Sequence, residues 1–223
     1  MNAILIWLLF CHGFLVSGPL DQVDNKHYLA LGDSYTIGES VDVKDRFPVQ
    51  LTEKLRSKGI EIDHPKIIAK TGWTTDELME GIQQAGLKNE YDLVTLLIGV
   101  NNQYRGRDIK NYQSEFTQLL EQSIAFAGGN KGRVIVVSIP DYGVTPFGQT
   151  KGQARIAREI DAFNEVNKQI CKQYDIAWID ITKISRSALH KSILVAKDGL
   201  HPSGKMYKMW VKEILPVAEE ILK

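Results

Sequence analysis

The chain of 223 residues is 43% hydrophobic and 24% charged, the usual composition of one globular domain with a sizeable core. Its 27 basic residues balance 27 acidic ones, so the formal net charge is zero. The charges are scattered along the chain, which favours a solvated surface. A chain with this balance lacks the positive field that holds nucleic acid or an anionic membrane, so neither is predicted as a partner.

An apolar segment at the N-terminus, residues 3–16, differs from the rest of the chain. Its length of about 14 residues falls short of the roughly 20 that a membrane-spanning helix needs. Small residues follow at Ser17 and Gly18, and a polar stretch follows at 21–25, which predicts a secretory leader over residues 1–18. No Lys or Arg precedes the apolar run and Pro19 follows it closely, so an N-terminal strand or anchor is the alternative.

The predicted compartment depends on that leader. If it is cleaved the protein is extracytoplasmic, either periplasmic or secreted, and otherwise it is cytoplasmic. Cys11 lies inside the leader, so cleavage leaves Cys171 as a single thiol and excludes an intramolecular disulfide. We expect Cys171 to be a small apolar residue on a helix, and the mature domain not to insert stably into a membrane.

Five short runs rich in Val, Ile and Leu predict β-strands along the chain. They lack the strict polar and apolar alternation of half-exposed strands, which is typical of parallel strands covered on both faces. In chain order these runs are residues 27–32, 62–69, 92–98, 133–139 and 176–181.

Amphipathic helices are predicted after these strands. Pro48 suits a first helical turn, Thr74 to Glu77 has the form of a capping box, and Ser203 can cap the last helix. Pro216 is expected to kink or restart that last helix. Apolar residues at helical spacing mark the five faces: Phe47, Leu51 and Leu55; Leu78, Ile82 and Ala85; Phe116, Leu119, Leu120 and Ala127; Ile156, Ile160, Phe163 and Ile170; Met206, Trp210 and Ile214.

Five strands alternating with five helices predict one open parallel sheet between two helical layers. Residues 26–223 contain no internal repeat, low-complexity tract or linker, so they are predicted to form a single domain. In such sheets the functional groups gather beyond the carboxyl ends of the strands. Ser34, Gly72 and Asn101 each follow one of the first three predicted strands.

Two motifs near the chain ends carry groups suited to acyl transfer. Ser34 ends the run Gly32-Asp33-Ser34 after the first strand, where it can be a nucleophile or only the N-cap of the next helix. His201 follows Asp198 by three residues, so one turn of backbone can bring the carboxylate to Nδ1 and leave Nε2 facing the serine. The other candidate histidines have no carboxylate in that relation: His27, His64 and His190.

Two further motifs lie between them. Gly72 stands in the sequence from Lys70 to Trp73, and Asn101 stands in Gly99-Val100-Asn101-Asn102. Taken alone, each has an ordinary structural explanation, because Gly72 can be a turn glycine and Asn101 a loop-capping amide. In the order serine, glycine, asparagine, histidine, the four motifs resemble those of the SGNH (GDSL-type) hydrolases, from about Tyr28 to the C-terminus.

The resemblance implies an α/β fold, a three-layer α/β/α sandwich with a five-stranded, mainly parallel, flavodoxin-like sheet. It also implies a serine ester hydrolase that uses no cofactor or metal. Ser34 would be the nucleophile, His201 the base and Asp198 the acid that orients it. The backbone N–H groups of Ser34 and Gly72 and the side-chain amide of Asn101 would form the oxyanion hole.

Three neighbouring positions qualify the resemblance. Asp33 matches the family's turn-shaping aspartate and is therefore left out of the triad. Tyr35 stands where the family often has leucine, and Asn102 where it usually has aspartate. Neither position carries the proton transfer, but the substitution at Asn102 leaves open how Asn101 is supported.

Large side chains on the predicted loops are expected to line a substrate cleft, with local packing as the alternative. Residues 142–152 are predicted to form a mobile loop or lid, because they contain three glycines and a proline. No long apolar tract marks an acyl channel, so short acyl or acetyl esters, including acetylated sugars, are the predicted substrates. Lysophospholipids and thioesters are the alternatives within the family. The lining candidates are Trp73, Tyr104, Arg105, Tyr142 and Phe147.

Two other functions compete with this prediction. A metallophosphoesterase also uses Gly-Asp, Gly-x-Asn and Gly-x-His motifs. A dinuclear metal site needs several clustered His and Asp ligands, however, and four of the five histidines in the chain are unsuitably placed for one. A binding module on the same fold, for example for a glycan, would have no physical reason to keep a complete triad. The sequence has no Gly-x-Ser-x-Gly elbow, P-loop or Gly-x-Gly-x-x-Gly motif.

Overall fold

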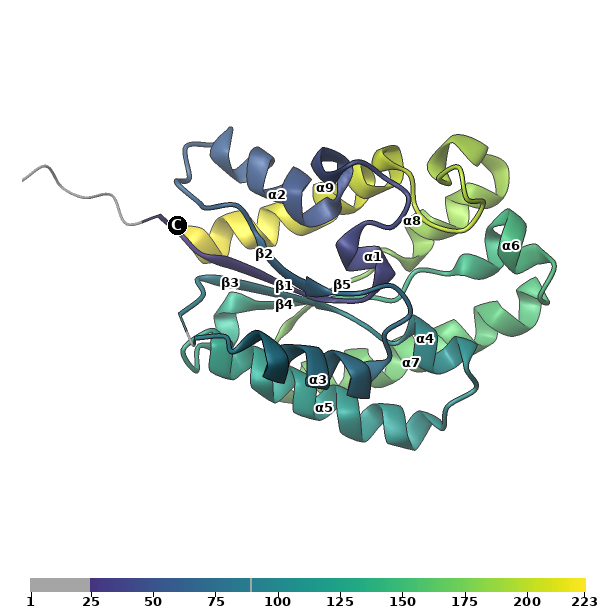
Figure 1. The fold of residues 1–223 in the computed structure, drawn as a ribbon, viewed down its shortest axis with the longest axis horizontal. Helices are drawn as coiled ribbons and strands as arrows, with labels where there is room; N and C mark the ends of the chain where they lie inside the picture. Colours follow the sequence, from purple (N-terminus) through teal and green to yellow (C-terminus); the bar gives the residue numbers. More distant parts are fainter. Residues whose placement is uncertain (1–24, 89) are drawn as a thin grey trace, which may run out of the picture.

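The computed structural model describes residues 25–88 and 90–223, so the predicted leader lies outside the described residues. A five-stranded sheet in the order β2-β1-β3-β4-β5 runs through this part of the chain, and every neighbouring pair is parallel (Figure 1). This confirms the predicted parallel sheet. The strands are β1 Tyr28–Gly32, β2 Lys66–Ala69, β3 Leu93–Leu97, β4 Val134–Val137 and β5 Ala177–Ile179.

The strands are shorter than the apolar runs that predict them. Ile62 makes only an isolated bridge to Lys26, well before β2 begins. Arg133 belongs to a 3-10 turn, and the N–H of Ile139 donates to the side chain of Asn164 at 2.8 Å. An apolar run therefore marks the buried stretch of backbone, while the paired strand occupies only its central part.

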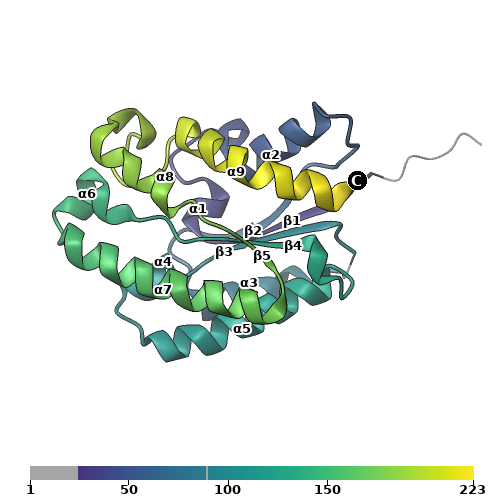
Figure 2. The same ribbon diagram turned by 180° about the vertical axis from the view of Figure 1, so that it is seen from behind.

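Two helical layers cover the sheet, as predicted. Helices α2 Phe47–Arg56 and α9 Gly204–Leu222 lie on one face (Figure 1). Helices α3 Thr75–Ala85, α5 Ile109–Phe126 and α7 Gln153–Tyr174 lie on the other, as the view from behind also shows (Figure 2). The long helices bury the apolar stripes that their sequence periodicity predicts, except that Ala85 at the end of α3 is exposed.

The predicted helix caps are present. Glu77 accepts the backbone N–H of Thr74 at 2.9 Å and completes the capping box of α3. The hydroxyl of Ser203 accepts the N–H of Met206 at the start of α9. Pro216 lies within α9, however, so the expected restart of the helix there is wrong. Its ring is exposed, and the buried apolar residues on the opposite face continue to the helix end: Trp210, Ile214, Ala218 and Leu222.

Four short helices lie beyond the carboxyl ends of the strands: α1 Ser34–Ile37, α4 Val100–Tyr104, α6 Pro146–Gln149 and α8 Thr182–Arg186. The segment predicted as a loop or lid, residues 142–152, contains α6 and a 3-10 turn at Tyr142–Val144. The hydroxyl of Thr145 caps α6 by accepting the N–H of Gly148 at 3.1 Å. These local hydrogen bonds use the turn-forming residues to build short helices within the segment, while its role as a mobile lid stays a prediction.

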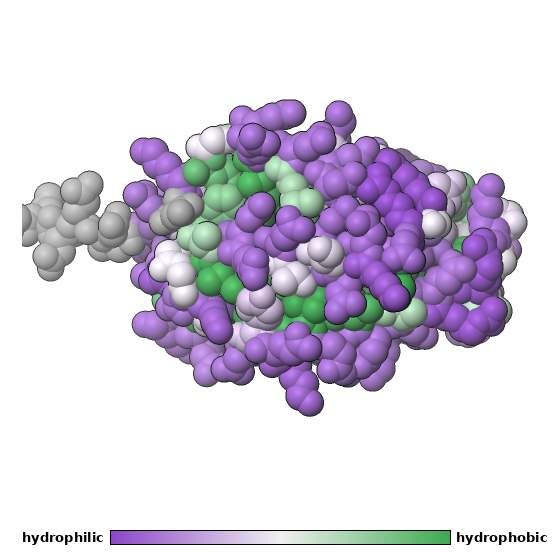
Figure 3. Space-filling view, turned by 90° about the horizontal axis from the view of Figure 1, so that it is seen from below, coloured by the Kyte–Doolittle hydropathy of each residue, from purple (hydrophilic) through white to green (hydrophobic). Residues whose placement is uncertain are grey.

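The face of the molecule seen from below, on the side of α3 and α5, is mostly hydrophilic with a few hydrophobic patches (Figure 3). Cys171 is fully buried on α7, and burial raises the pKa of its thiol to about 12, which fits the predicted apolar role. Within residues 25–88 and 90–223, no helix is both long enough and apolar enough to span a bilayer.

Candidate active site

The order of the strands places Ser34 between two of the other predicted site residues. Strand β1 lies between β2 and β3, and Ser34, Gly72 and Asn101 follow these three strands. The chain turns to opposite sides of β1 at this point, the position where ligands bind in open parallel sheets. All three residues line one cavity of about 200 Å³, and His201 lines it as well.

Ser34 is the first residue of α1, and it is 4% exposed. The N-cap is Asp33, whose Oδ1 accepts the N–H of Tyr35 at 3.0 Å, so the alternative that Ser34 is merely a helix cap is wrong. A Cβ at Gly32 would lie 2.2 Å from the hydroxyl of Thr36 and 2.4 Å from the carbonyl oxygen of Leu97. Glycine therefore lets the helix begin directly against the end of the strand.

Asp33 is fully buried below this turn. Burial raises the pKa of its carboxyl to about 7, and the hydrogen bond from the N–H of Tyr35 opposes that rise. Its contact with α1 gives it a structural role at the start of the helix. The geometry agrees with leaving Asp33 out of the predicted triad.

The side chains of Asp198 and His201 are joined by a short hydrogen bond. His201 Nδ1 lies 2.6 Å from Asp198 Oδ2, while Oδ1 accepts the N–H groups of Leu200 at 2.9 Å and His201 at 3.0 Å. Partial burial raises the pKa of Asp198, but these hydrogen bonds, with one from Ser40, outweigh it and lower the pKa to about 2. The carboxylate therefore stays charged at ordinary pH and leaves Nε2 as the ring nitrogen for proton exchange.

The other described histidines occupy different surroundings. His27 Nδ1 lies 3.2 Å from Asp63 Oδ2, a pair that the sequence analysis missed because the two residues are far apart in the chain. His27 precedes β1, whereas Ser34 follows it, so this pair lies at the opposite end of the strand. His64 and His190 are exposed, while His201 is 8% exposed.

Asn101 is held by a backbone carbonyl. Its Nδ2 donates to the carbonyl oxygen of Trp73 at 2.9 Å, which uses one of the two amide hydrogens. Asn102 Oδ1 accepts the N–H of Thr75 at 3.1 Å, and its Nδ2 donates to the hydroxyl of Thr75 at 2.6 Å. Asn102 thus ties α4 to the start of α3, which answers how Asn101 is supported without the family's usual aspartate.

Trp73 and Arg105 do not line the cavity. Arg105 donates to the carbonyl oxygen of Gly72 at 2.7 Å and pairs with Glu77 at 3.2 Å. It therefore fixes the Gly72 turn, whose φ of +87° favours glycine. Trp73 packs against α3, where a Cβ at Gly81 would lie 2.1 Å from its ring.

The remaining three predicted lining residues do meet at the cavity. The rings of Tyr104, Tyr142 and Phe147 have centroids 6.0, 6.2 and 6.4 Å apart, and we call them the aromatic wall. Tyr104 is 52% exposed and Tyr142 is 5% exposed, so the wall runs from the surface into the fold. The sequence analysis missed four lining residues that each lie next to a predicted one: Tyr35, Thr71, Val100 and Leu200.

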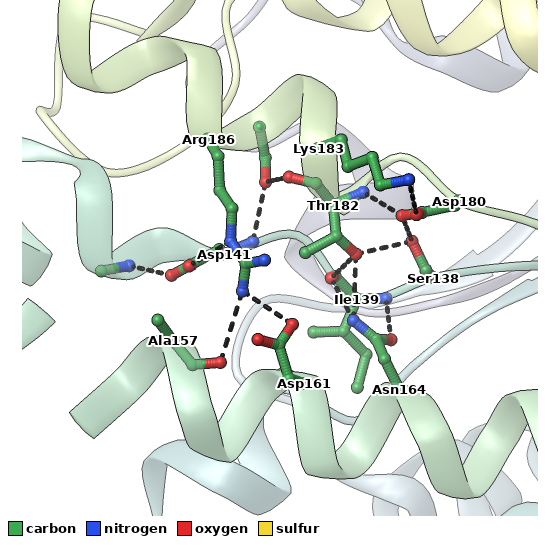
Figure 4. Close-up of polar contacts among 12 residues, drawn as sticks. Ser138, Ile139, Asp141, Ala157, Asp161, Asn164, Asp180, Thr182, Lys183 and Arg186 are labelled. Carbon is green, nitrogen blue, oxygen red and sulfur yellow. Dashed lines mark hydrogen bonds and ion pairs between the residues drawn. The ribbon is translucent and has the colours of Figure 1, made fainter. Parts of the chain in front are cut away.

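A polar network holds the segment that carries Tyr142 (Figure 4). Asp141 is 1% exposed, accepts the N–H of Gly143 at 2.8 Å and pairs with Arg186 at 2.9 Å. Arg186 also reaches Asp161 on α7 at 2.7 Å. These partners come from separate elements, so no local sequence pattern identifies them. The network therefore fixes the backbone that carries Tyr142, one of the three rings of the aromatic wall.

In the part of the chain that the structure describes, no three His, Cys, Asp or Glu side chains gather in a group that could hold a metal ion. The site is built instead from a hydroxyl, an imidazole, a carboxylate and hydrogen-bond donors around one cavity. These are the groups that nucleophilic acyl transfer requires.

Comparison with known proteins agrees with this chemistry. Residues 30–209 match the GDSL-like lipase/acylhydrolase family. Similar solved structures include TesA (18% identity, TM-score 0.70, covering 88% of this chain and 100% of that one). Also similar is a lipase/acylhydrolase from Enterococcus faecalis, at 20% identity and a TM-score of 0.69, covering 89% of this chain and 97% of that one. The acetylxylan esterase Axe2 from Geobacillus stearothermophilus is similar at 18% identity and a TM-score of 0.66, covering 86% of this chain and 94% of that one. At these identities the likeness shows the shared fold, and no curated protein matches the chain.

Proposed function

Because the chain belongs to the GDSL-like lipase/acylhydrolase family and is therefore an ester-bond hydrolase, we propose that Ser34, His201 and Asp198 form its catalytic triad. The observation that carries this proposal is one cavity lined by both Ser34 and His201, with the 2.6 Å contact between His201 Nδ1 and Asp198 behind it. The ionised state of Asp198 supports its role as the group that orients the imidazole.

The proposed reaction has two steps. Ser34 Oγ attacks the ester carbonyl carbon while His201 Nε2 takes the hydroxyl proton, and Asp198 stabilises the imidazolium that forms. The tetrahedral intermediate collapses as the C–O bond to the leaving alcohol breaks, and His201 returns the proton to the alkoxide. Water then attacks the acyl-enzyme by the same route and releases the carboxylic acid together with free Ser34.

Three donors are proposed for the oxyanion of the intermediate: the backbone N–H groups of Ser34 and Gly72 and the free amide hydrogen of Asn101. Arg105 and Asn102 hold the two flanking segments. Donors fixed in this way cost no reorganisation when charge develops on the carbonyl oxygen.

Asn101→Ala is expected to lower kcat by about 10²–10³-fold with little change in KM, because the lost donor binds charge that exists only in the transition state. Steady-state kinetics on a soluble ester measures both constants. Asn111→Ala, which removes an exposed amide on α5, is the matched control and should leave both constants unchanged. An Asn101 variant with normal kcat and raised KM would assign Asn101 to substrate positioning.

The size and lining of the cavity support small acyl groups. Its volume of about 200 Å³ lies below the range of roughly 300–1,000 Å³ usual for larger ligands. The aromatic wall closes one side of it, and exposed Tyr104 offers a ring face on which a sugar can stack. We therefore propose short acyl or acetyl esters as substrates, including acetylated sugars, with lysophospholipids and thioesters as alternatives.

A series of p-nitrophenyl esters tests this substrate class. We expect kcat/KM to be at least about tenfold higher for acetyl and butyryl esters than for the decanoyl ester, since the aromatic wall limits chain length. Phe147→Ala, which opens the wall, should raise the relative rate with longer esters. Rates that rise steadily with acyl length in the unaltered enzyme would contradict a small acyl pocket.

A further inference from the structure

The hydroxyl of Ser40 contacts the carboxylate of the proposed triad. Ser40 Oγ donates to Asp198 Oδ2 at 2.8 Å, the same oxygen that lies 2.6 Å from His201 Nδ1. The other oxygen, Oδ1, accepts only backbone N–H groups. Among the described residues, Ser40 is thus the only side chain besides His201 that hydrogen-bonds this carboxylate.

The backbone of Ser40 is in an unfavourable conformation. Its φ of +64° lies in the left-handed region, which one other described non-glycine residue, Asp175, also adopts. Asp175 ends helix α7, where such a conformation is common, whereas Ser40 stands in a turn after α1. A non-glycine residue keeps this conformation only where its surroundings fix it.

The contacts that fix this turn come from the active site itself. The N–H of Glu39 donates to the carbonyl oxygen of Ser34 at 3.0 Å. The carboxylate of Glu39 accepts a hydrogen bond from the hydroxyl of Thr71, which lines the cavity beside Gly72. The turn from Glu39 to Ser40 therefore joins the segment of Ser34, the Gly72 turn and Asp198.

We propose that Ser40 is a positioning residue that holds Asp198 in the orientation His201 requires, an inference that rests on the proposed triad. With two backbone donors on Oδ1 and the Ser40 hydroxyl on Oδ2, the carboxylate is fixed against rotation. The hydrogen bond from this hydroxyl also stabilises the negative charge on Oδ2, which weakens the attraction between the carboxylate and the imidazolium proton.

Two variants separate the hydroxyl from the backbone conformation. Ser40→Ala removes the hydroxyl and keeps the strained φ, whereas Ser40→Gly removes the hydroxyl and relieves the strain. We expect both to lower kcat by about three- to tenfold with KM nearly unchanged, the range for one exposed charge-assisted hydrogen bond. Both should also move the acid limb of the kcat/KM profile to higher pH, because the freed carboxylate holds the imidazolium proton more tightly.

Ser40→Thr is the complementary variant. It retains the hydroxyl, so kcat and the pH profile should stay close to those of the unaltered enzyme. Its β-branched side chain strains the left-handed backbone, so its Tm should fall, whereas Ser40→Gly should keep its Tm. Besides Asp198, the titratable groups that line the cavities around His201 are Tyr35, Tyr104, Tyr142 and Asp141, and they are the same in all three variants.

Ser57→Ala, an exposed serine at the end of α2, is the matched control and should change neither kcat nor the pH profile. Normal kcat and an unmoved acid limb in both Ser40→Ala and Ser40→Gly would overturn the positioning role. Loss of activity in Ser40→Ala with full activity in Ser40→Gly would overturn it too, because the backbone alone would then matter. Neither result would disprove the triad, which Ser34→Ala and His201→Ala test separately.

Discussion

Replacing Ser34 with alanine is expected to lower kcat for ester hydrolysis by about 10⁴–10⁶-fold. The change removes the proposed nucleophile but keeps the backbone N–H of residue 34 as an oxyanion donor. Only one oxygen is lost from a side chain at the cavity wall, so the Tm should stay within about 2 °C of the unaltered value. Kinetics with p-nitrophenyl acetate and a thermal melt measure the two effects.

Covalent labelling tests the same assignment without turnover. A fluorophosphonate probe should add one mass increment to the unaltered protein and none to Ser34→Ala, because the probe reacts with an activated serine hydroxyl. The control Ser57→Ala should label and hydrolyse normally. Activity of more than a few per cent in a correctly folded Ser34 variant would mean that the nucleophile is misassigned.

The sequence predicts the sheet and the meeting of the site residues for one physical reason. Parallel strands buried on both faces are continuous apolar runs, so each run marks a strand, and the residue after it lies at the sheet's carboxyl edge. Ser34, Gly72 and Asn101 each follow a predicted strand within three residues, so this rule places them at that edge, whereas the resemblance to the SGNH hydrolases selects them as site residues. The motif of Asp198 and His201 is local, and the hydrogen bond within it follows from one turn of backbone.

What the sequence did not predict depends on contacts between distant segments. Arg105 was expected to bind substrate, but its guanidinium fixes the carbonyl of Gly72, a partner that only the folded chain brings near. Asp141 and Arg186 are 45 residues apart and meet across two elements. Pro216 shows the same limit, because burial of the opposite face of α9 outweighs the local tendency of proline to break a helix.

His201→Ala is expected to be about as damaging as Ser34→Ala, because the base and the nucleophile act as one unit. The double variant should therefore lose no more activity than either single variant, whereas independent contributions would multiply. The residual rate of His201→Ala should also lose its acid limb and rise with hydroxide concentration, since no imidazole remains to take the serine proton. Steady-state rates across the pH range measure both effects.

His27→Ala is the matched control for this experiment. His27 also has a carboxylate partner, Asp63 at 3.2 Å, but the pair lies at the end of β1 opposite to Ser34. A histidine paired with a carboxylate is therefore not enough; the pair must face the cavity that holds the serine. Loss of activity in His27→Ala with normal turnover in His201→Ala would contradict the assignment. We expect the reverse, with normal turnover in His27→Ala and loss of activity in His201→Ala. This would show that the position of a His–Asp pair at the carboxyl edge of the sheet, and not the pairing alone, determines which histidine is catalytic.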